Sequence, residues 1–511
     1  MHEDRIRGRL PFALGAFLGG LLLYGLTCAP GVVWQDSAMF QFRVWHGDLA
    51  GDLGLPLSHP LYILLAELFC LLPLDDFAFR VNLFSAVCGA ACLAVTVDLL
   101  ISLTRSRFAA AVGTLLLAVS HTFWAHAVIA EVYDLYALGL VAELWLIERF
   151  VGRHQVRWLV LAALVNGLNL SNHLMAILHW PTYLGLVIWA LRVRRIRPVH
   201  LPALLAAFLV GCLPYLILIF REMLSSRPAF EVLKEALVGP PSRATFVLAV
   251  SFSLARQIAR TVLYFALNFP TPLALLIPAG VWIGWTQPRI RWFVALSAGI
   301  FLADFVFAVR YLVADQYVFF MPCYVIAALL AGLAVPRLAA QSLPRRVVIV
   351  VLAMLPAAVY EAAPSVLRRE NVALGVGRDI PTRDTYAYFI RPRKNGDESA
   401  QRFAEAAFEQ AAPDGLLLAD ITIKNVLVCV RDVEGLHRGV TLNYGQDTTP
   451  ALPAVEFSSD AVRPFAERGK AFVCSAAAGY VPSWLLEEYN LTPAGMIFRL
   501  VPKSSGPAAP L

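Results

Sequence analysis

The chain has 511 residues, of which 59% are hydrophobic and 15% charged, with a mean hydropathy of +0.66. Soluble domains carry about 25% charged residues, so this composition excludes a soluble globular protein and indicates an integral membrane protein. The net charge of +6 does not indicate nucleic-acid binding, because the basic residues cluster in short loops between apolar segments. That pattern is the one that sets membrane orientation.

A spanning helix needs about 20 predominantly apolar residues, and the sequence contains about eleven segments of that kind. The predicted spans are residues 11–28, 77–103, 108–123, 131–150, 157–171, 173–191, 201–220, 261–285, 291–309, 316–336 and 346–363. The apolar segment 60–73 is shorter and fits an interfacial or re-entrant helix. The fold class is therefore mainly α, a multi-pass helical protein.

One arginine cluster precedes the first predicted span and the others follow every second span, so all of them fall on one side of the membrane. By the positive-inside rule that side is cytoplasmic. The N-terminus is then cytoplasmic, and the loops 29–76 and 221–260 and the C-terminal tail are extracytoplasmic. The clusters are Arg5, Arg7 and Arg9; Arg105 and Arg107; Arg149, Arg153 and Arg157; Arg192, Arg194, Arg195 and Arg197; Arg289 and Arg291; and Arg337, Arg345 and Arg346.

The composition becomes more polar after the last span and predicts two domains, a transmembrane domain at 1–363 and a small α/β domain at 364–511. Residues 398–412 have a helical pattern, and 391–396 resemble a linker. The predicted strands are 416–419, 440–442, 471–473 and 496–498. Cys429 and Cys474 lie in this tail, where they either form a disulfide or remain free thiols, since spacing does not fix geometry.

Two carboxylates stand out because they fall at the ends of spans on the predicted outer face. Asp36 precedes an amphipathic segment, Ser37–Trp45, that would lie in the interface. There Asp36 either caps a helix or accepts a proton from an incoming hydroxyl. Glu131 begins the fourth span, where it either interacts with the helix dipole or orients an acceptor or a divalent metal.

Arginine and histidine side chains near the same face provide further candidates. Arg80 and Arg310 lie at outer span ends, where an arginine either anchors the helix in the interface or binds phosphate through two hydrogen bonds. His59 and His173 lie near that face too, but the chain's histidines do not have metal-ligand spacing. None of the eight cysteines forms a metal-spaced pair either. The sequence therefore predicts no set of metal ligands, and a divalent metal beside Glu131 stays an open alternative.

Several motifs together resemble a known family. They include Trp34-Gln35-Asp36-Ser37, Ser58-His59-Pro60-Leu61-Tyr62, residues 79–86, residues 129–133 with Glu131 and Tyr133, residues 167–173 with Asn172 and His173, and residues 315–322. Their order is similar to bacterial multi-pass proteins long described as a domain of unknown function. The animal relative of those proteins is a transmembrane protein O-mannosyltransferase, and the wider class is the GT-C glycosyltransferases. The resemblance covers roughly residues 10–340.

The resemblance implies a membrane glycosyltransferase whose donor is a polyprenyl-phosphate-linked sugar, a hexose such as mannose. The acceptor is a hydroxyl on a protein or glycan at the extracytoplasmic face of a bacterial inner membrane. Asp36 would be the general base of an inverting reaction, with Glu131 as a second catalytic acid. His59, Tyr62, Tyr133, Asn172 and His173 are the substrate-site candidates. Arg80 and Arg310 are the candidates that bind the donor phosphate; this assignment comes from their positions and not from the resemblance.

One position departs from the family pattern. The family usually has a second acid three residues after the aspartate of the first loop, whereas this chain has Ala38-Met39 after Ser37. If the second acid contributes to catalysis or binding in the family, this chain differs from the family in its donor, its acceptor or its activity. Two other interpretations therefore stay open, a lipid or solute transporter and a non-catalytic membrane protein whose tail is the working part.

Overall fold

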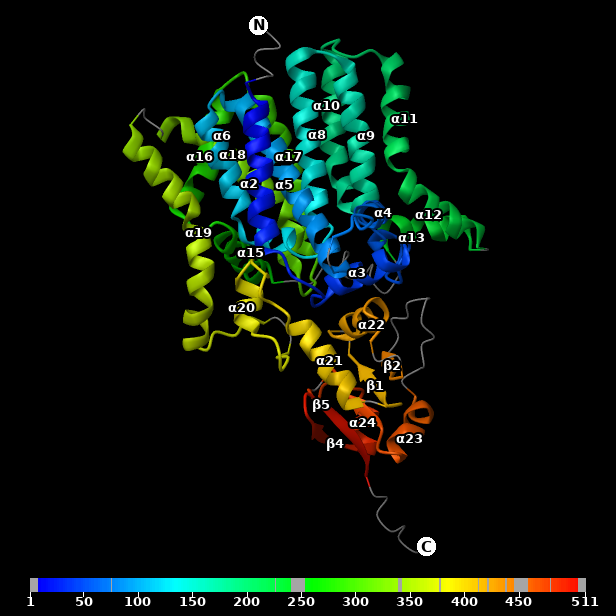
Figure 1. Cartoon of the computed structure of the whole chain (residues 1–511). Coiled ribbons are helices and arrows are strands. Elements are labelled where there is room, and N and C mark those ends of the chain that lie inside the picture. Colours follow the sequence, from blue (N-terminus) through cyan, green and yellow to red (C-terminus); the bar gives the residue numbers. More distant parts are fainter. Residues whose placement is uncertain are drawn as a thin grey trace, which may run out of the picture.

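The structure is a computed structural model that describes residues 8–74, 76–225, 227–239, 253–338, 342–375, 378–411, 413–420, 422–436, 439–444, 458–477 and 479–503. Arg5 and Arg7 and residues 240–252 of the loop 221–260 lie outside these ranges. Long helices form a bundle, and a smaller α/β tail packs against one end of it (Figure 1). The N-terminus lies at the opposite end of the bundle from the tail.

The first half of the bundle surrounds one long buried helix, α5. Its elements are α2 (Leu10–Thr27), α3 (Asp36–His46), η1 (Leu55–Leu57), α4 (Pro60–Phe69), α5 (Phe77–Thr104), α6 (Arg107–Ala118), α7 (His121–Ala127), α8 (Tyr133–Arg153), α9 (Val156–Asn172), η2 (Leu174–His179) and α10 (Trp180–Arg192).

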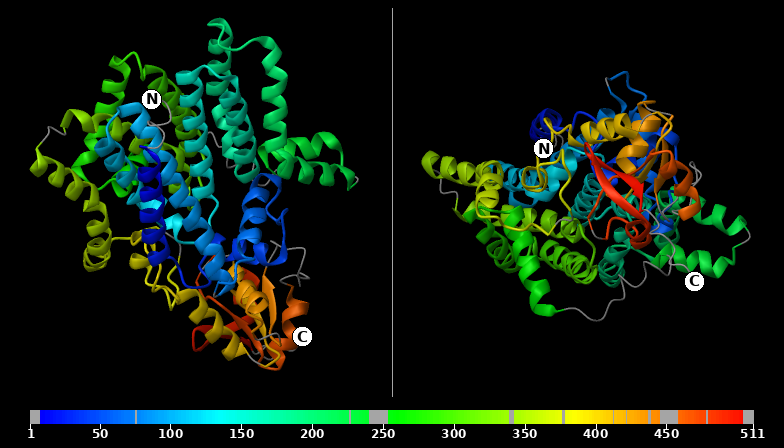
Figure 2. Two further views of the ribbon diagram at one scale, coloured as in Figure 1. Left: turned by 45° about the horizontal axis from the view of Figure 1, so that its top comes forward. Right: turned by 90° about the horizontal axis from the view of Figure 1, so that it is seen from below.

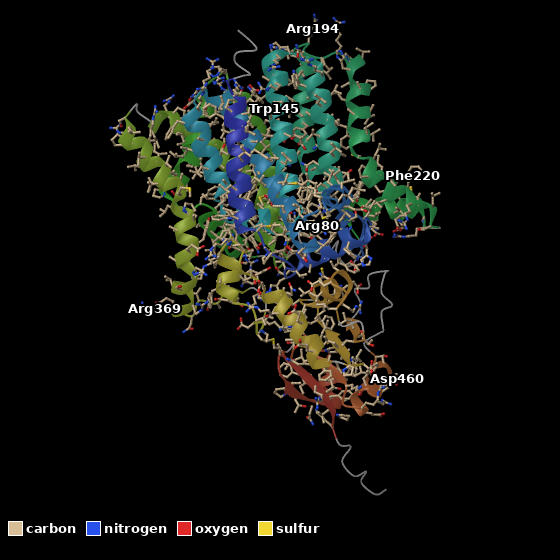
Figure 3. The ribbon with its side chains drawn as sticks, viewed as in Figure 1. Arg80, Trp145, Arg194, Phe220, Arg369 and Asp460 are labelled. Atoms are coloured by element: carbon tan, nitrogen blue, oxygen red, sulfur yellow. The ribbon has the colours of Figure 1, made fainter. Side chains whose placement is uncertain are left out.

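The second half contains α18, which is buried along its whole apolar length. Its elements are η3 (Pro198–His200), α11 (Leu201–Gly211), α12 (Leu213–Leu224), α13 (Ala229–Val238), α15 (Leu254–Asn268), η4 (Pro272–Leu275), α16 (Leu276–Thr286), α17 (Arg291–Arg310), η5 (Gln316–Phe320), α18 (Met321–Leu338) and α19 (Leu343–Arg369). Helix α19 and the α12–α13 pair flank the bundle on opposite sides, as both the side view and the view from below show (Figures 1 and 2). Phe220 of α12 lies at the outer edge of that flank (Figure 3).

Glycine lets helices approach closely in this bundle. A Cβ on Gly113 of α6 would lie 3.0 Å from the Cα of Gly332 on α18. A Cβ on Gly167 of α9 would lie 2.1 Å from the carbonyl oxygen of Phe208 on α11. Small residues at such crossings are typical of membrane helices, whose association depends on tight van der Waals packing.

By length and composition, the described residues contain six helices that could cross a membrane, or up to nine if each of three bent helix pairs counts as one span. The predicted count of about eleven would require α8 and α9 to be spans as well. Helix α8 carries charged residues along its length, and α9 has 17 residues. The number of spans therefore stays a prediction.

The prediction of one continuous helix over 261–285 is wrong. The chain there forms α15 and α16, and the two helical parts meet at an angle of 120°. The break contains Pro270 and Pro272, and proline removes a backbone donor and disfavours a helical conformation in the residue before it. The predicted spans 108–123 and 201–220 are also bent, by 69° and 71°, and Pro214 lies in the first turn after the second bend.

Basic residues from separate loops gather at the end of the bundle away from the tail. The carboxylate of Asp98 lies 3.7 Å from Arg9 and 2.5 Å from Arg149. Arg194 is at the same end (Figure 3). These contacts bring together arginines that the hydropathy pattern assigned to one side, and they support the predicted order of the helices.

A buried ionic cluster crosses the bundle interior. The imidazole of His179 lies 3.5 Å from a carboxylate oxygen of Glu143 and 3.3 Å from one of Asp304, and all three side chains are fully buried. The hydroxyl of Tyr136 lies 3.1 Å from the same imidazole. The cluster connects α8, η2 and α17. Titratable side chains inside a membrane bundle usually face the interior and contact one another in this way.

The tail confirms the predicted α/β pattern. Its elements are α20 (Thr385–Ile390), α21 (Ser399–Ala411), β1 (Leu416–Ala419), α22 (Lys424–Val433), β2 (Thr441–Tyr444), α23 (Ser459–Glu467), β3 (Ala471–Val473), α24 (Ser483–Glu488), β4 (Tyr489–Ala494) and β5 (Ile497–Pro502).

The strand order in the tail sheet is β2-β1-β3-β5-β4, with β1 parallel to both neighbours and β5 antiparallel to both of its own. The four predicted strands correspond to β1, β2, β3 and β5. The sequence did not predict β4, which contains Pro493; proline in a sheet is confined to edge strands such as this one. Cys429 and Cys474 are buried free thiols, so they do not form the disulfide that was considered.

The loop between α3 and α4 closes around one buried arginine. Arg43 is 1% exposed. Its guanidinium donates hydrogen bonds to the carbonyl oxygens of Asp48, Leu49 and Ser58, at 3.0, 3.1 and 2.6 Å. These bonds fold residues 47–58 back so that α4 begins beside α3.

We therefore expect Arg43→Ala to destabilise the protein by about 3 kcal/mol, because buried carbonyl groups lose their donors. Thermal unfolding of the detergent-purified protein measures the change. Arg468→Ala, which removes an exposed arginine of the tail, is the control and should leave the melting temperature in place. Equal melting temperatures for both variants would contradict this account of the loop.

Candidate active site

The tail docks on the bundle through residues far apart in the sequence. The indole nitrogen of Trp34 donates to Ser399 Oγ at 2.8 Å. The backbone N–H of Lys394 donates to the carbonyl of Thr27, at the end of α2, at 2.8 Å. His121 Nε2 lies 3.0 Å from the carbonyl oxygen of Phe389. The tail therefore closes over the end of the bundle that carries α3 and α7.

A cavity of about 500 Å³ lies between the two parts, a volume within the range of small-molecule sites. Its walls come from the loops at the bundle end and from the tail segments 383–394 and 422–428. Of the residues predicted from sequence, five line it: Asp36, His59, Glu131, Tyr133 and His173. Met39, which departs from the family pattern, lines it as well.

Four carboxylates line this cavity: Asp36, Asp52, Glu131 and Asp315. Asp36 is the exposed first residue of α3. Glu131 is buried and Asp315 is half-buried, and desolvation raises the pKa of both. The charge of Asp36 raises the pKa of Glu131 further. When neighbouring carboxyl groups lie in different environments, one can accept a proton while the other remains protonated.

The residue before Asp36 has an unusual backbone. Gln35 has φ 63° and ψ −134°, a region that favours glycine. Asn425 of the tail donates to the Gln35 carbonyl at 3.4 Å. Strained residues persist where the surroundings impose them, and they cluster at functional sites, which supports a functional position for Asp36.

Tyr62 does not line the cavity but positions a residue that does. Its hydroxyl lies 3.0 Å from Ser85 Oγ. The hydroxyl of Ser85 in turn lies 3.1 Å from both the backbone N–H and the carbonyl oxygen of Glu131. Tyr62 and Ser85 therefore fix the backbone from which the Glu131 carboxyl reaches the cavity.

Asn172 also acts through its neighbours. Its side-chain amide donates to the backbone carbonyl of Val132 at 3.0 Å, and the backbone carbonyl oxygen of Asn172 lies 2.6 Å from His59 Nδ1. A carbonyl only accepts, so Nδ1 of His59 carries the proton and Nε2 keeps its lone pair.

His173 has the opposite arrangement. The Met175 backbone N–H donates to His173 Nδ1 at 3.2 Å, so the proton of the neutral ring is on Nε2. Burial lowers the pKa of both imidazoles, to about 4 for His59, which keeps them neutral near pH 7. Their ring centroids are 5.1 Å apart. The pair offers one acceptor and one donor side by side, which suits a hydroxyl group.

Three cations in the wall come from the tail, and none was predicted. Arg383 and Lys394 are 6% and 5% exposed. Lys424 lies 3.9 Å from the carboxylate of Asp52. The Lys394 ammonium donates to the carbonyls of Tyr388 and Arg391, both at 2.6 Å. Burial lowers its pKa to about 8.

Arg383 is held mainly by aromatic rings. Its guanidinium carbon lies 5.7 Å from the ring centre of Trp34 and 5.0 Å from that of Phe389. It donates one hydrogen bond, to the carbonyl of Arg378 at 3.2 Å. Within the described part of the chain, Nε and Nη1 have no acceptor. Buried donors without a partner are rare, so this group is suited to an anionic ligand.

The two arginines predicted to bind phosphate lie elsewhere. Arg80 donates to the carbonyls of Cys70 and Leu72, at 2.7 and 3.2 Å, and so closes the turn between α4 and α5. Figure 3 places it at the tail-facing end of the bundle. Arg310 is exposed at the end of α17. Neither lines the cavity.

The missed residues gave only weak signals in the sequence. Asp315 begins the motif 315–322 that carries part of the family resemblance, but as a loop acid before an apolar segment it was not singled out as a site residue. Residues 391–396 are basic but resemble a linker, and Arg383 is an isolated arginine in a polar tail. In the described ranges, no group of three or more His, Cys, Asp or Glu side chains is arranged to hold a metal ion.

Residues 54–196 match the family model of the protein O-mannosyl-transferase TMEM260 N-terminal domain. The matched segment contains His59, Glu131 and His173, whereas Asp36 precedes it. No curated protein matches the chain at the sequence level.

Among solved structures, the chain is similar to ArnT from Cupriavidus metallidurans bound to undecaprenyl phosphate, with a TM-score of 0.56 and 15% identity. The match covers 99% of this chain and 100% of ArnT. The chain has the GT-C glycosyltransferase fold. A second structure, the Archaeoglobus fulgidus oligosaccharyltransferase in complex with zinc and sulfate, has a TM-score of 0.48 and 11% identity over 81% of this chain and 61% of that one. The GT-C fold and the long apolar helices make this an integral membrane protein.

The buried state of His59 predicts a pH dependence. Its pKa in the folded protein, about 4, is below the usual 6.5, so the unfolded chain binds more protons between these values. The stability that neutral His59 contributes is complete above about pH 6.5 and is lost as the pH falls toward 4.

His59 has a left-handed backbone (φ 48°), which asparagine tolerates. We therefore expect His59→Asn to reduce the loss of thermal stability between about pH 7 and about pH 5. Melting curves at both pH values measure it. His154→Asn, an exposed residue with a similar backbone (φ 59°), is the control. A pH dependence identical to that of the wild type would show that His59 is not buried in its neutral form.

Proposed function

We propose that this protein is an integral-membrane glycosyltransferase that transfers a sugar from a polyprenyl-phosphate carrier to a hydroxyl group. The observation that carries the proposal is a cavity in which carboxylates from the bundle and buried cations from the tail line the same space. The ArnT structure of the same fold was solved with undecaprenyl phosphate. A hexose such as mannose, on a protein or glycan acceptor, is the substrate class that the TMEM260 match favours.

In the proposed reaction, Asp36 accepts the proton of the acceptor hydroxyl. The acceptor oxygen attacks the anomeric carbon from the face opposite the phosphate, and the bond between that carbon and the phosphate oxygen breaks. The bonding electrons leave with the phosphate, and the configuration at the anomeric carbon is inverted. The protonated Glu131 is suited to donate a hydrogen bond to a substrate oxygen, while His59 and His173 hold a sugar hydroxyl.

Arg383 and Lys394 are the groups that we assign to the leaving phosphate. Fixed cations in a water-poor site stabilise negative charge that develops in the transition state. Arg383 supplies two unpaired N–H groups, and Lys394 supplies a charge fixed by two carbonyls. This assignment replaces Arg80 and Arg310, whose side chains do not reach the cavity.

We infer that the cavity is extracytoplasmic and the N-terminus cytoplasmic, as in a bacterial inner-membrane enzyme. The supporting observation is the group of arginines at the end of the bundle away from the tail, since basic loops stay in the cytoplasm. The division at residue 363 into a transmembrane domain and a tail domain belongs to this proposal, and both domains contribute to the site.

The His179 cluster inside the bundle is the feature that bears on the transporter alternative. Transporters place polar groups beside interrupted helices at mid-membrane. Glu143 and Asp304 both lie against His179, all three side chains are fully buried, and none of them lines either of the cavities described. The cluster therefore fits a structural connection between helices better than a transport path.

We expect Asp36→Asn to lower transfer at least about a hundredfold, in the range of general base catalysis, while the protein folds and inserts normally. Mass spectrometry of extracytoplasmic proteins and envelope glycans measures it, with Asp460→Asn of the tail (Figure 3) as the matched control. A hexose-sized modification that persists in Asp36→Asn would exclude Asp36 as the base. Its absence from wild-type cells would favour a non-catalytic or transport function.

Arg383→Gln should weaken donor binding by about tenfold or more and leave acceptor binding unchanged, because a charged hydrogen bond is lost. Donor KM and the affinity for polyprenyl phosphate measure the effect. Arg80→Gln is the comparison, and it should reduce stability more than donor affinity. If the Arg80 variant alone weakened donor binding, the phosphate site would lie at the α4–α5 turn instead.

A further inference from the structure

A second, smaller cavity of about 200 Å³ adjoins the catalytic one. Arg383, Tyr388 and Lys394 line both cavities, so these side chains form a shared wall. The rest of the smaller cavity is strongly basic. Five of its lining residues are cationic and two are carboxylates; the cations beyond the shared wall are Arg391, Arg393 and Arg402.

The carboxylates of this cavity already have partners. Asp384 accepts from the backbone N–H of Ala387 at 3.1 Å, and Asp397 accepts from that of Ser399 at 3.0 Å. Neither forms an ion pair with Arg383 or Lys394 among the contacts of the described residues. The buried Nε and Nη1 of Arg383 thus lack an acceptor, which is costly unless a ligand supplies one.

The chemistry of the wall favours a phosphate group. Guanidinium groups bind phosphate oxygens through paired N–H bonds, and Arg383, Arg391 and Arg393 provide three of them around a space of this size. Arg391 and Arg393 are held in place by Glu361 of α19, at 3.2 and 2.5 Å. Arg402 is exposed at the start of α21.

The position of the cavity identifies the source of that phosphate. Its walls are fixed to the tail-facing ends of two peripheral helices, because Lys394 is bonded to Thr27 of α2 and Arg393 to Glu361 of α19 (Figure 1). Only 11% and 28% of the apolar stretches of α2 and α19 are buried, so both helices face lipid. A headgroup that moves along the bilayer surface therefore reaches this cavity from the membrane.

We propose that the second cavity binds the phosphate headgroup of the polyprenyl carrier on its way between the bilayer and the catalytic cavity. Arg383 and Lys394 pass the phosphate from one cavity to the other, since they contact both. The proposal rests on the proposed function for the identity of the lipid, but binding can be measured without transfer.

The test is the affinity of the purified full-length protein for a polyprenyl phosphate, measured by native mass spectrometry. The double variant Arg393→Gln/Arg402→Gln should bind it about tenfold more weakly. Arg369→Gln is the matched control, since Arg369 is exposed at the lower end of α19 outside both cavities (Figure 3). It should keep the wild-type affinity, and all variants should share the wild-type melting temperature.

Two further probes separate the sources of the anion. Polyprenol, which lacks the phosphate, should bind the wild type and the double variant equally. If inorganic phosphate alone stabilises the wild type and not the double variant, while polyprenyl phosphate binds both equally, the site takes a free anion and the headgroup assignment is wrong. Unchanged affinity of the double variant for every probe would overturn the proposal.

Transferase assays on the same proteins keep the two proposals apart. Transfer by the wild type, with unchanged lipid-phosphate affinity in the double variant, would overturn only the second cavity's role. Lipid-phosphate binding that depends on Arg393 and Arg402, in a wild type without transferase activity, would overturn only the proposed function.

Discussion

The architecture of the site depends on holding two buried cations in the same cavity as two carboxyl groups, with no ion pair between them among the described residues. Arg383 and Lys394 come from the tail, and Glu131 and Asp315 come from loops of the bundle. Burying a charge without a partner costs several kcal/mol, so the docking of the tail must be strong enough to offset it. What results is a cavity with positive and negative walls, which can hold a phosphate at one side and a nucleophile at the other.

The helices place those walls at one end of the bundle. Breaks near Pro214 and at Pro270 and Pro272 turn helices aside at that end, while glycine contacts keep the helices beyond it closely packed. Functional side chains then project from short loops on a rigid scaffold, which is the usual division of work between loops and regular elements. A substrate attached to a lipid can reach such a site without leaving the bilayer.

Burial also sets the protonation of the site. His59 and His173 stay neutral because desolvation disfavours their charged forms, and Glu131 is raised by burial together with the charge of Asp36. Each imidazole has one nitrogen fixed by a backbone group, so its tautomer is defined before substrate binds. The site thus offers preset donors and acceptors, and its reorganisation on binding is small.

The sequence by itself determined the membrane class, the position of most helices of the bundle, the common end of the basic loops and five of the cavity residues, including Asp36 and Glu131. These depend on local properties such as hydropathy, segment length and short motifs. Only the tertiary structure decided which cations face those acids, because the docking contact between Trp34 and Ser399 joins residues 365 positions apart. Likewise, only the folded chain showed that Arg80 closes a turn, since a side chain's partner depends on the element packed against it, and local sequence does not encode that element.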